Sequence, residues 1–527
     1  MKSHTTPIFK LLVISLCMLS FGLAMAQTLR WATQGDIQTA DPHSQNELLT
    51  NSINGQVYEA LVIRDKQMRL SPGLAESWQQ VSPTVWRMKL RSNVKFHDGS
   101  LLRSDDVVFS VNRAKDPASA IRAYANAMGE PKAVDAFTVE FNLSQFNPIF
   151  LEHASLVQIM SKAWSEKNNA SKPQDFKNKE EKFTSLNTNG TGPYMMISRQ
   201  PDTRTVYRRN ANWWGKFDGN VQEVIYTPVK SDATRSAALI SGELDFVLDP
   251  VPQDLQRLRS GNTKVVDGAE NRAVFIGMDQ ARDELLYSNV KGKNPFKDVR
   301  VRKALYHAVD IEAIRSRLMR GQAFPTGSIL PSPLGHFNDA ELEKRLPFDL
   351  TRAKQLMVEA GYPQGFEVTL DCPNNRYIND EEICVALSAM WSQIGVRIKV
   401  NATPRAIYFP KAEKLDVSMY MLGWGGAITD AETTLTPILR SRADGGVGYY
   451  NWGNFKNSKI DELASASSKE ADPVKREQLI KAAFREHNEQ VHHIPLHRQV
   501  IPWAMRTNVD VVHRPDNWLE WRWITVK

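Results

Sequence analysis

The strongest constraint on the fold is the alternation of strand-like and helix-like segments in two separate stretches of the chain. In the first stretch, apolar–polar alternation at Leu29 and Trp31 is followed later by the helix-like "DATRSAALIS" and the short apolar "LDFV". In the second, "FEVTLDC" and "VRIKVN" flank a helical pattern from Asp380 to Ile394. Strands that alternate with helices build α/β layers. The sequence therefore predicts an α/β protein with two units.

The N-terminus has the features of a secretory signal peptide. Lys2 and Lys10 precede an apolar run from Leu11 to Leu23, and "AMA" precedes Gln27. This order of basic, apolar and small residues is typical of an export signal that is cleaved after a small residue. We therefore predict that residues 1–26 are removed and that the mature chain is periplasmic. No later apolar run approaches the roughly 20 residues that a transmembrane helix needs.

Size and charge limit the classes of function. After removal of the signal, about 500 residues remain, which is enough for two or three domains. The formal net charge of the whole chain is +7, and its basic residues are interspersed with acidic ones. This pattern argues against a nucleic-acid-binding surface, which would need clustered positive charge. We expect no nucleic-acid partner, and we expect a monomer.

Cys372 and Cys384 are the cysteines of the predicted mature chain. In an oxidising compartment an isolated pair is more often bridged than free. A disulfide that closes a loop of this length stabilises a fold by roughly 3 kcal/mol in the chain-entropy model. The alternative is a pair of reduced, buried thiols.

The sequence lacks the common catalytic motifs. We find no G-x-S-x-G elbow, H-E-x-x-H helix, phosphate-binding G-x-x-x-x-G-K-[ST] loop or C-x-x-C pair. His492, His493 and His497 in "HHIPLH" suggest a metal, because imidazole suits nickel. Their spacing, however, follows a strand that contains a proline. We predict neither enzymatic activity, nor a cofactor, nor a metal site.

A series of motifs through the mature chain resembles one protein family. The motifs are, in order, "GLAESWQ", "WRMKLRSNVKFHDGSLLRSDDVVFS", "GTGPY", "VYRRNANWWG", "RSAALISGELDF", "FKDVRVRKALYHAVD" and "IPLH". In this order and spacing they resemble the family 5 extracellular solute-binding proteins of ABC transporters. Members of that family bind dipeptides, oligopeptides, glutathione, nickel and some opines.

The resemblance implies a two-lobed periplasmic-binding-protein fold that closes on its ligand. On this sequence we place lobe I at 27–290 plus 495–527, with an extra subdomain inserted at about 71–195, and lobe II at 291–494. The implied function is that of a receptor, which captures a small peptide or peptide-like solute between the lobes and delivers it to an inner-membrane permease. A non-peptide ligand, such as an opine, a sugar conjugate or a metal complex, is the alternative. A secreted hydrolase is a more distant one.

The resemblance also implies ligand contacts. In peptide-binding relatives, an arginine in a loop of lobe II holds the ligand carboxylate, and Arg376, beside Tyr377, occupies such a loop. A guanidinium offers a planar fork that suits a carboxylate. The alternatives are a surface arginine or one paired with Asp380. In "GYYNWGNF", Tyr449 and Asn451 are further candidates to face the cleft, with core packing as the alternative.

The stretch "GWGGAITD" supplies the remaining candidates. Trp424 would form an aromatic wall, and Gly425 would let the backbone approach the ligand. Peptide-binding relatives carry an acid three residues after this tryptophan, to pair with the ligand α-amine, and here that residue is Ala427. Asp430 either replaces it or caps a helix at Ala431. An α-amine without a carboxylate loses a charge-assisted hydrogen bond of roughly 1.5–3 kcal/mol, which keeps the non-peptide alternative open.

Overall fold

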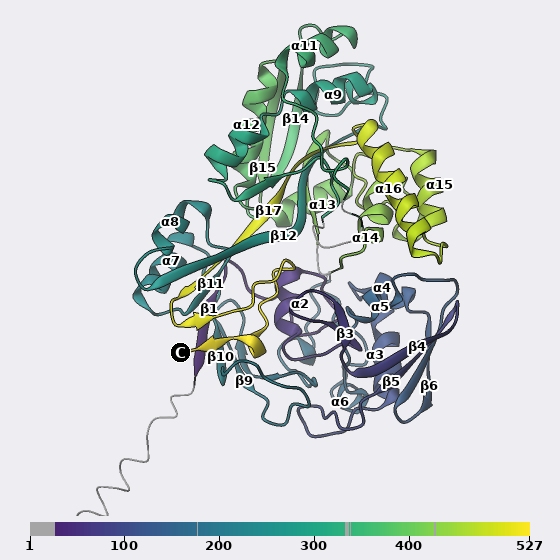
Figure 1. Ribbon diagram of the computed structural model, residues 1–527, viewed down its shortest axis with the longest axis vertical. Coiled ribbons are helices and arrows are strands. Elements are labelled where there is room, and N and C mark those ends of the chain that lie inside the picture. Colours follow the sequence, from purple (N-terminus) through teal and green to yellow (C-terminus); the bar gives the residue numbers. More distant parts are fainter. Residues whose placement is uncertain (1–26, 177, 332–336, 338, 426–427) are drawn as a thin grey trace, which may run out of the picture.

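Two units joined by a pair of long strands make up the molecule (Figure 1). The computed structural model describes residues 27–176, 178–331, 337, 339–425 and 428–527. The predicted signal peptide and Ala427 lie outside the described residues. Within the described ranges, no helix combines the length and the apolar character needed to cross a membrane.

The joining strands, β12 (Thr263–Met278) and β17 (His493–Arg506), run antiparallel through both units. Their register shifts between Ala269 and Ala273, which marks a bulge near the middle of the pair. β17 is a continuous strand of 14 residues with 13 of them buried. Pro495 and Pro502, which have no backbone N–H to donate, both lie inside this strand. Pairing with β12 holds the strand together across both prolines.

The first unit continues the large sheet beyond β17 through β11, β1, β10, β9 and β8. β1 pairs in parallel with β10 and β11, as the predicted α/β alternation requires. α2 ends at Gly55, and Val57 and Tyr58, which follow it, pack in the core. The elements are β1 (Thr28–Ala32), α2 (Leu48–Asn54), β8 (Tyr194–Gln200), β9 (Arg204–Arg209), β10 (Glu223–Tyr226), α7 (Asp232–Ser241), β11 (Phe246–Leu248) and α8 (Leu255–Leu258). The small hairpin of β18 (Val509–Asp510) and β19 (Thr525–Val526) follows β17.

A separate four-stranded antiparallel sheet, in the order β4-β5-β7-β6, lies at the lower right of Figure 1. It shares a hydrophobic core with the helices around it, distinct from the core of the large sheet. The elements are β2 (Val62–Arg64), β3 (Leu70–Pro72), β4 (Ala75–Ser82), β5 (Val85–Leu90), α3 (Ser104–Ala114), α4 (Arg122–Ala127), β6 (Glu130–Asp135), β7 (Thr138–Asn142), α5 (Phe150–Ala154) and α6 (Lys162–Lys167). The predicted limits of the inserted subdomain, 71–195, stay a prediction.

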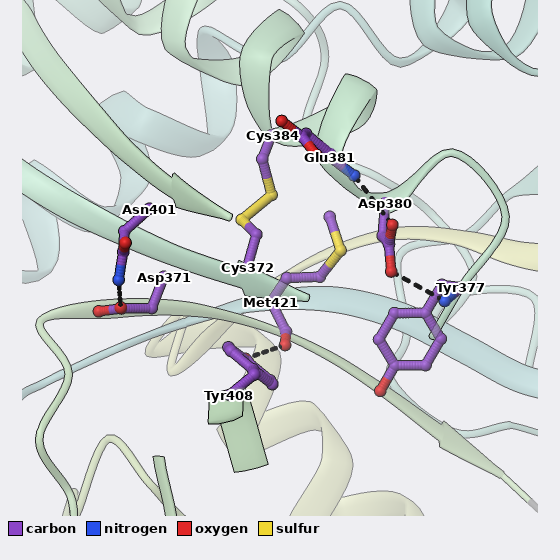
Figure 2. The surroundings of a disulfide bond; sticks show 9 residues. All are labelled: Asp371, Cys372, Tyr377, Asp380, Glu381, Cys384, Asn401, Tyr408 and Met421. Atoms are coloured by element: carbon purple, nitrogen blue, oxygen red, sulfur yellow. Dashed lines mark hydrogen bonds between the residues drawn. A yellow bond between two sulfur atoms is a disulfide. The ribbon is translucent and has the colours of Figure 1, made fainter. Parts of the chain in front are cut away.

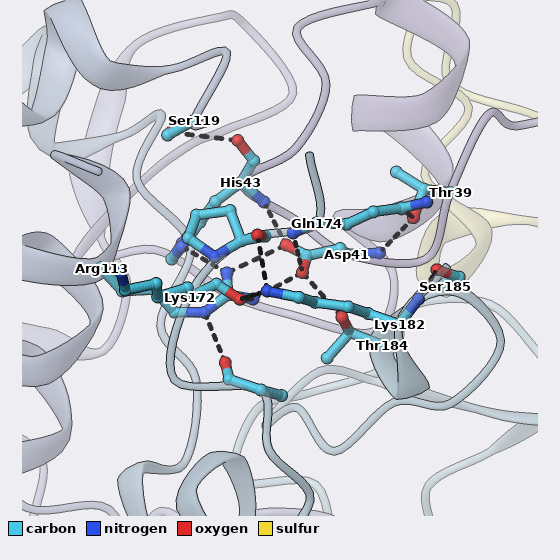
Figure 3. Close-up of polar contacts among 12 residues, drawn as sticks. Thr39, Asp41, His43, Arg113, Ser119, Lys172, Gln174, Lys182, Thr184 and Ser185 are labelled. Carbon is cyan, nitrogen blue, oxygen red and sulfur yellow. Dashed lines mark hydrogen bonds and ion pairs between the residues drawn. The ribbon is translucent and has the colours of Figure 1, made fainter. Parts of the chain in front are cut away.

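A buried ion pair fastens this part to the N-terminal loop (Figure 3). Arg113 of α3 and Asp41 are both fully buried and form an ion pair. The Asp41 carboxylate also accepts hydrogen bonds from Gln174 N (3.3 Å) and Thr184 Oγ1 (2.8 Å). Gln174 and Thr184 therefore anchor the lysine-rich stretch from Trp164 to Thr188, whose described residues are otherwise mostly exposed or half-buried. Such a pair is tolerated in the interior because hydrogen bonds satisfy the remaining polar atoms.

The second unit extends the sheet on the other side of β12 through β16, β14 and β15. Its core includes Val274 of β12 and Ile494 of β17, whereas Trp503 of β17 packs in the core of the first unit. The elements are α9 (Val299–His307), α10 (Ile311–Ala313), β13 (Ala323–Pro325), α11 (Leu350–Glu359), β14 (Phe366–Pro373), α12 (Asp380–Ser392), β15 (Val396–Thr403), α13 (Arg405–Glu413), β16 (Met419–Gly425), α14 (Glu432–Thr434), α15 (Ser458–Ser467) and α16 (Pro473–Glu489). Residues at one end of each joining strand therefore pack in the first unit, and residues at the other end pack in the second.

Candidate functional site

The two units meet at a junction that includes several of the predicted site residues. Gln253 Nε2 of the first unit donates to Asn379 Oδ1 of the second at 3.4 Å. In a second contact between the units, the charge of Asp430 in the second unit acts on Glu152 of α5 in the first, adding to burial in raising the pKa of Glu152. We use "junction" for the contact between the units that includes Gln253, Asn379, Glu152 and Asp430.

Arg376 and Tyr377 lie in the loop between β14 and α12, at the junction. The carboxylate of Asp380 accepts the backbone N–H groups of Arg376 (2.9 Å) and Tyr377 (3.0 Å). Asp380 therefore shapes the loop through its backbone, and the alternative that it pairs with the Arg376 side chain is wrong. The guanidinium carbon of Arg376 lies 5.1 Å from the centre of the Tyr377 ring. Burial and the charge of Arg272 lower the pKa of Arg376.

A disulfide ties together the two elements that flank this loop (Figure 2). Cys372 at the end of β14 is bonded to Cys384 of α12, with 6.8 Å between their Cα atoms. Both residues are buried in the core of the second unit. The prediction of a disulfide is confirmed, and the bond fixes the base of the loop that carries Arg376.

A polar network that we did not predict lies next to the loop. Arg272 Nε donates to Glu270 Oε1 at 2.9 Å, and Gln499 Nε2 donates to Glu270 Oε2 at 3.0 Å. All three side chains are buried at the bulge of β12 and β17. The signal in the sequence was the polar triplet "ENR" directly before the apolar run "AVFIGM".

The glycines of "GWGGAITD" make room for neighbouring protein groups. A Cβ at Gly423 would lie 2.5 Å from the Tyr377 ring, and a Cβ at Gly425 would lie 1.8 Å from Asn271 O. These positions need glycine because a strand and a ring pack directly against them. Close packing within the protein thus accounts for both residues, without the ligand approach that we had inferred for Gly425.

The predicted ligand contacts Trp424, Tyr449 and Asn451 separate into two groups. Trp424 is half-buried, donates from Nε1 to Thr433 O at 2.9 Å, and has its ring 4.7 Å from that of Tyr450. Tyr449 is 40% exposed and contacts Tyr450. Asn451, in contrast, is fully buried, and its side chain bonds to the backbone at Arg440 and Phe455. The structure therefore does not bring Asn451 to the junction.

Asp430 is held by an arginine of its own unit. Both Asp430 oxygens accept hydrogen bonds from Arg476 of α16, at 2.7 and 2.8 Å, and Oδ1 also accepts Glu432 N. The side chains are only 14% and 9% exposed. Asp430 thus caps the following turn, which was one of the two alternatives, and its charge is already neutralised. Across the junction, Glu152 is paired in the same way with Arg64.

The histidines near the end of the chain form a buried neutral cluster. His487 Nε2 is hydrogen bonded to His493 Nδ1 at 2.8 Å, and His492 Nδ1 to Gln280 Oε1 at 2.8 Å. Burial lowers the pKa of His487 to about 4. Among the described residues, no three His, Cys, Asp or Glu side chains are arranged to hold a metal ion. The cluster is part of the packing of the second unit.

Comparison with known proteins identifies the family of this chain. A model of the bacterial extracellular solute-binding proteins, family 5 Middle, matches residues 69–446, which is more than half of the chain. The chain belongs to the family 5 bacterial extracellular solute-binding proteins. This solute-binding protein is 26% identical over 463 residues to the glutathione-binding protein GsiB of Escherichia coli (strain K12), with 86% of this chain and 85% of GsiB covered.

Solved structures share the fold of this solute-binding protein. The periplasmic binding protein DppA from Helicobacter pylori, in complex with the peptide STSA, has a TM-score of 0.79 and 21% identity, and the match covers 95% of this chain and 98% of DppA. The binding protein AgaA from A. tumefaciens R10, in complex with agropinic acid, has a TM-score of 0.79 and 21% identity, covering 95% and 99%. The predicted α/β, two-lobed fold is confirmed.

We expect the disulfide to be quantitative in exported protein, so that denatured, unreduced protein contains no free thiol. The variant Cys372→Ala/Cys384→Ala should lose about 2–5 kcal/mol of unfolding free energy, because its unfolded chain is less constrained. Urea unfolding and a thiol count measure the two quantities. Two free thiols per chain, or an unchanged unfolding midpoint in the double variant, would contradict this expectation.

The histidine cluster should make stability depend on pH. Burial lowers the folded-state pKa of His487 to about 4, whereas an unfolded histidine titrates near pH 6.5. The unfolded chain therefore binds protons first, so this stabilisation is complete above about pH 6.5 and is lost as the pH falls toward about 4.

We expect the fall in unfolding free energy between about pH 7 and about pH 5 to be smaller in His487→Gln than in the wild type. Comparing the two proteins cancels Glu59 and Glu432, whose pKa values burial raises to about 7 and which act in the opposite sense. Equal pH dependence of the urea midpoints in both proteins would exclude the cluster as a source of this effect.

Proposed function

We propose that this protein is the periplasmic receptor of an ABC importer, and that it captures a small peptide or peptide-like solute with a carboxylate at the junction and delivers it to the permease. The observation that carries the ligand class is the environment of the Arg376 guanidinium. In the described residues its guanidinium lies against the Tyr377 ring and has no carboxylate within ion-pair distance. A partly buried cation of this kind favours an anionic partner.

The relatives support a ligand of this class. GsiB is named for glutathione, and the DppA structure contains a peptide. AgaA, bound to agropinic acid, supports the alternative of a non-peptide ligand. The acids at the junction favour that alternative, because Asp430 and Glu152 already pair with Arg476 and Arg64 and are not free to hold an α-amine. A ligand with a carboxylate and without a strongly held α-amine satisfies both observations.

The proposed mechanism is a shift of population between open and closed forms. Ligand contacts with both units stabilise the closed form, so that a permease distinguishes a loaded receptor from an empty one. β12 and β17 are the natural hinge, because each strand packs in the first unit at one end and in the second unit at the other. In this proposal the chain passes from one lobe to the other within these strands, instead of after residue 290. No covalent chemistry is required.

The proposed ligand contacts are Arg376, Tyr377, Trp424 and Tyr449. We also propose that residues 1–26 direct export, that the protein is released into the periplasm and that it is a monomer. Asn451, Gly425 and Asp430 act within the second unit in this account, since packing and the Arg476 pair occupy them.

We expect native mass spectrometry of receptor purified from the periplasm to find a bound solute that carries at least one carboxylate. Arg376→Ala should weaken calorimetric binding of that solute by about 10- to 100-fold, since it removes charge-assisted hydrogen bonds worth about 1.5–3 kcal/mol.

Arg397→Ala is the matched control. Arg397 lies on β15 of the same unit, is 60% exposed and pairs with Glu367, so its removal changes the net charge equally without touching the junction. Equal affinity of Arg376→Ala and wild type would remove Arg376 from the site. Recovery of a solute with no acidic group would overturn the proposed ligand class.

A further inference from the structure

The bulge of the joining strands contains three consecutive buried polar residues. Glu270, Asn271 and Arg272 are 3%, 1% and 5% exposed, although β12 is otherwise mainly apolar after this point. Burying a charged pair is costly unless its hydrogen bonds are satisfied. A bulge next to a binding site commonly serves to aim a side chain. The position of Arg272 therefore calls for a reason beyond the stability of the strand.

Contacts of this triplet close a ring that reaches the loop of Arg376. Arg272 Nη1 and the Tyr377 hydroxyl each donate to Gly423 O at 3.3 Å. On the other side, Glu270 accepts from Gln499, and Gln499 Oε1 accepts Ile378 N at 3.4 Å. The ring thus joins β12, β16 and β17 to the loop between β14 and α12.

Two guanidinium groups approach the same tyrosine within this ring. Arg272 shares the acceptor Gly423 O with the Tyr377 hydroxyl, and Arg376 lies against the Tyr377 ring. Like charges at this range disfavour each other, and the Arg272 charge accordingly lowers the pKa of Arg376 after burial, which is the larger cause. The groups that act in the opposite direction are Tyr377, Glu47 of the first unit and Glu270.

Those two carboxylates already have direct partners. Glu47 caps α2 by accepting Thr50 N at 3.0 Å, and Glu270 holds Arg272 and Gln499. Arg272 uses Nε and Nη1 on Glu270 and Gly423, and in the described part of the chain its Nη2 makes no direct hydrogen bond. Arg272 therefore keeps its Nη2 edge while it is paired with Glu270, and Arg376 forms no ion pair among the described residues.

We propose that Arg272 is a second cationic ligand contact, which acts with Arg376 on one acidic group of the solute, and that Glu270 and Gln499 position it. This inference rests on the proposed function and refines it, because it makes the acidic group the main feature that the receptor reads. A carboxylate between the two guanidinium groups relieves their repulsion and receives hydrogen bonds from both. It also connects the ligand to the hinge strand directly.

The test compares acids with amides. Calorimetry uses glutathione and Met-Leu, each as the free acid and with its carboxylates converted to carboxamides, against wild type and Arg272→Gln. We expect wild type to bind the preferred free acid at least about tenfold more tightly than the amide, and Arg272→Gln to lose most of that preference while its affinity for the amide is nearly unchanged. Equal weakening for acid and amide, or none for either, overturns the inference.

Two further proteins keep the result interpretable. Glu270→Gln/Arg272→Gln removes both charges of the buried pair, so it avoids an unpaired carboxylate and should show the same loss of preference with unchanged circular dichroism. Arg397→Gln, with its exposed arginine, should retain the wild-type preference. A double variant that folds and still prefers the acid would contradict the role of Arg272.

A bare dicarboxylate separates failure of the inference from failure of the proposed function. If neither peptide binds in either form, the peptide-like ligand class fails, and glutarate then serves as the probe in thermal unfolding. Stabilisation of wild type by glutarate that is lost in Arg272→Gln supports the two-arginine site. Absence of any stabilisation by glutarate in wild type overturns it.

Discussion

The pairing of β12 with β17 is the interaction on which the rest of the structure depends. β17 enters the core of both units, and β12 packs through Val265 in the first unit and through Val274 in the second, so neither unit completes its sheet without them. The bulge between Ala269 and Ala273 is where the pairing is interrupted and where charged groups enter the strand. A pair of strands that is continuous at both ends and irregular in the middle allows two rigid units to change their angle with little loss of packing. The same irregularity places Arg272 beside the loop of Arg376.

Charge at the junction is arranged so that the acids are satisfied within their own units. Asp430 is neutralised by Arg476, and Glu152 by Arg64. The two units therefore approach each other without strong attraction from these groups. Arg376 differs, because burial and a neighbouring guanidinium disfavour its charge. In the proposed function, an anionic solute supplies the missing partner of Arg376, so that closure depends on the solute.

The sequence predicted those features that depend on local pattern. Period-two alternation located β1, and helical periodicity located α12, whose observed bounds differ from the prediction by two residues at one end. Cysteine number and the export signal were enough for the disulfide. Residues whose roles depend on distant partners were missed: Asp41 pairs with Arg113 and Asp430 with Arg476, far along the chain. Asn451 was misread for a related reason, since its buried partners Arg440 and Phe455 could not be identified from its local pattern.

The central claim, that solute binding closes the two units on each other, is tested most directly by an electron spin resonance distance between them. Spin labels at Val134→Cys of β6 and Val474→Cys of α16, which are 51% and 63% exposed, report on opposite sides of the junction, and the bonded Cys372 and Cys384 do not react. The account predicts that a tryptic digest of casein, or the solute recovered from the periplasm, shifts a broad distance distribution to a shorter and narrower one. An unchanged distribution under conditions where calorimetry records binding would contradict it.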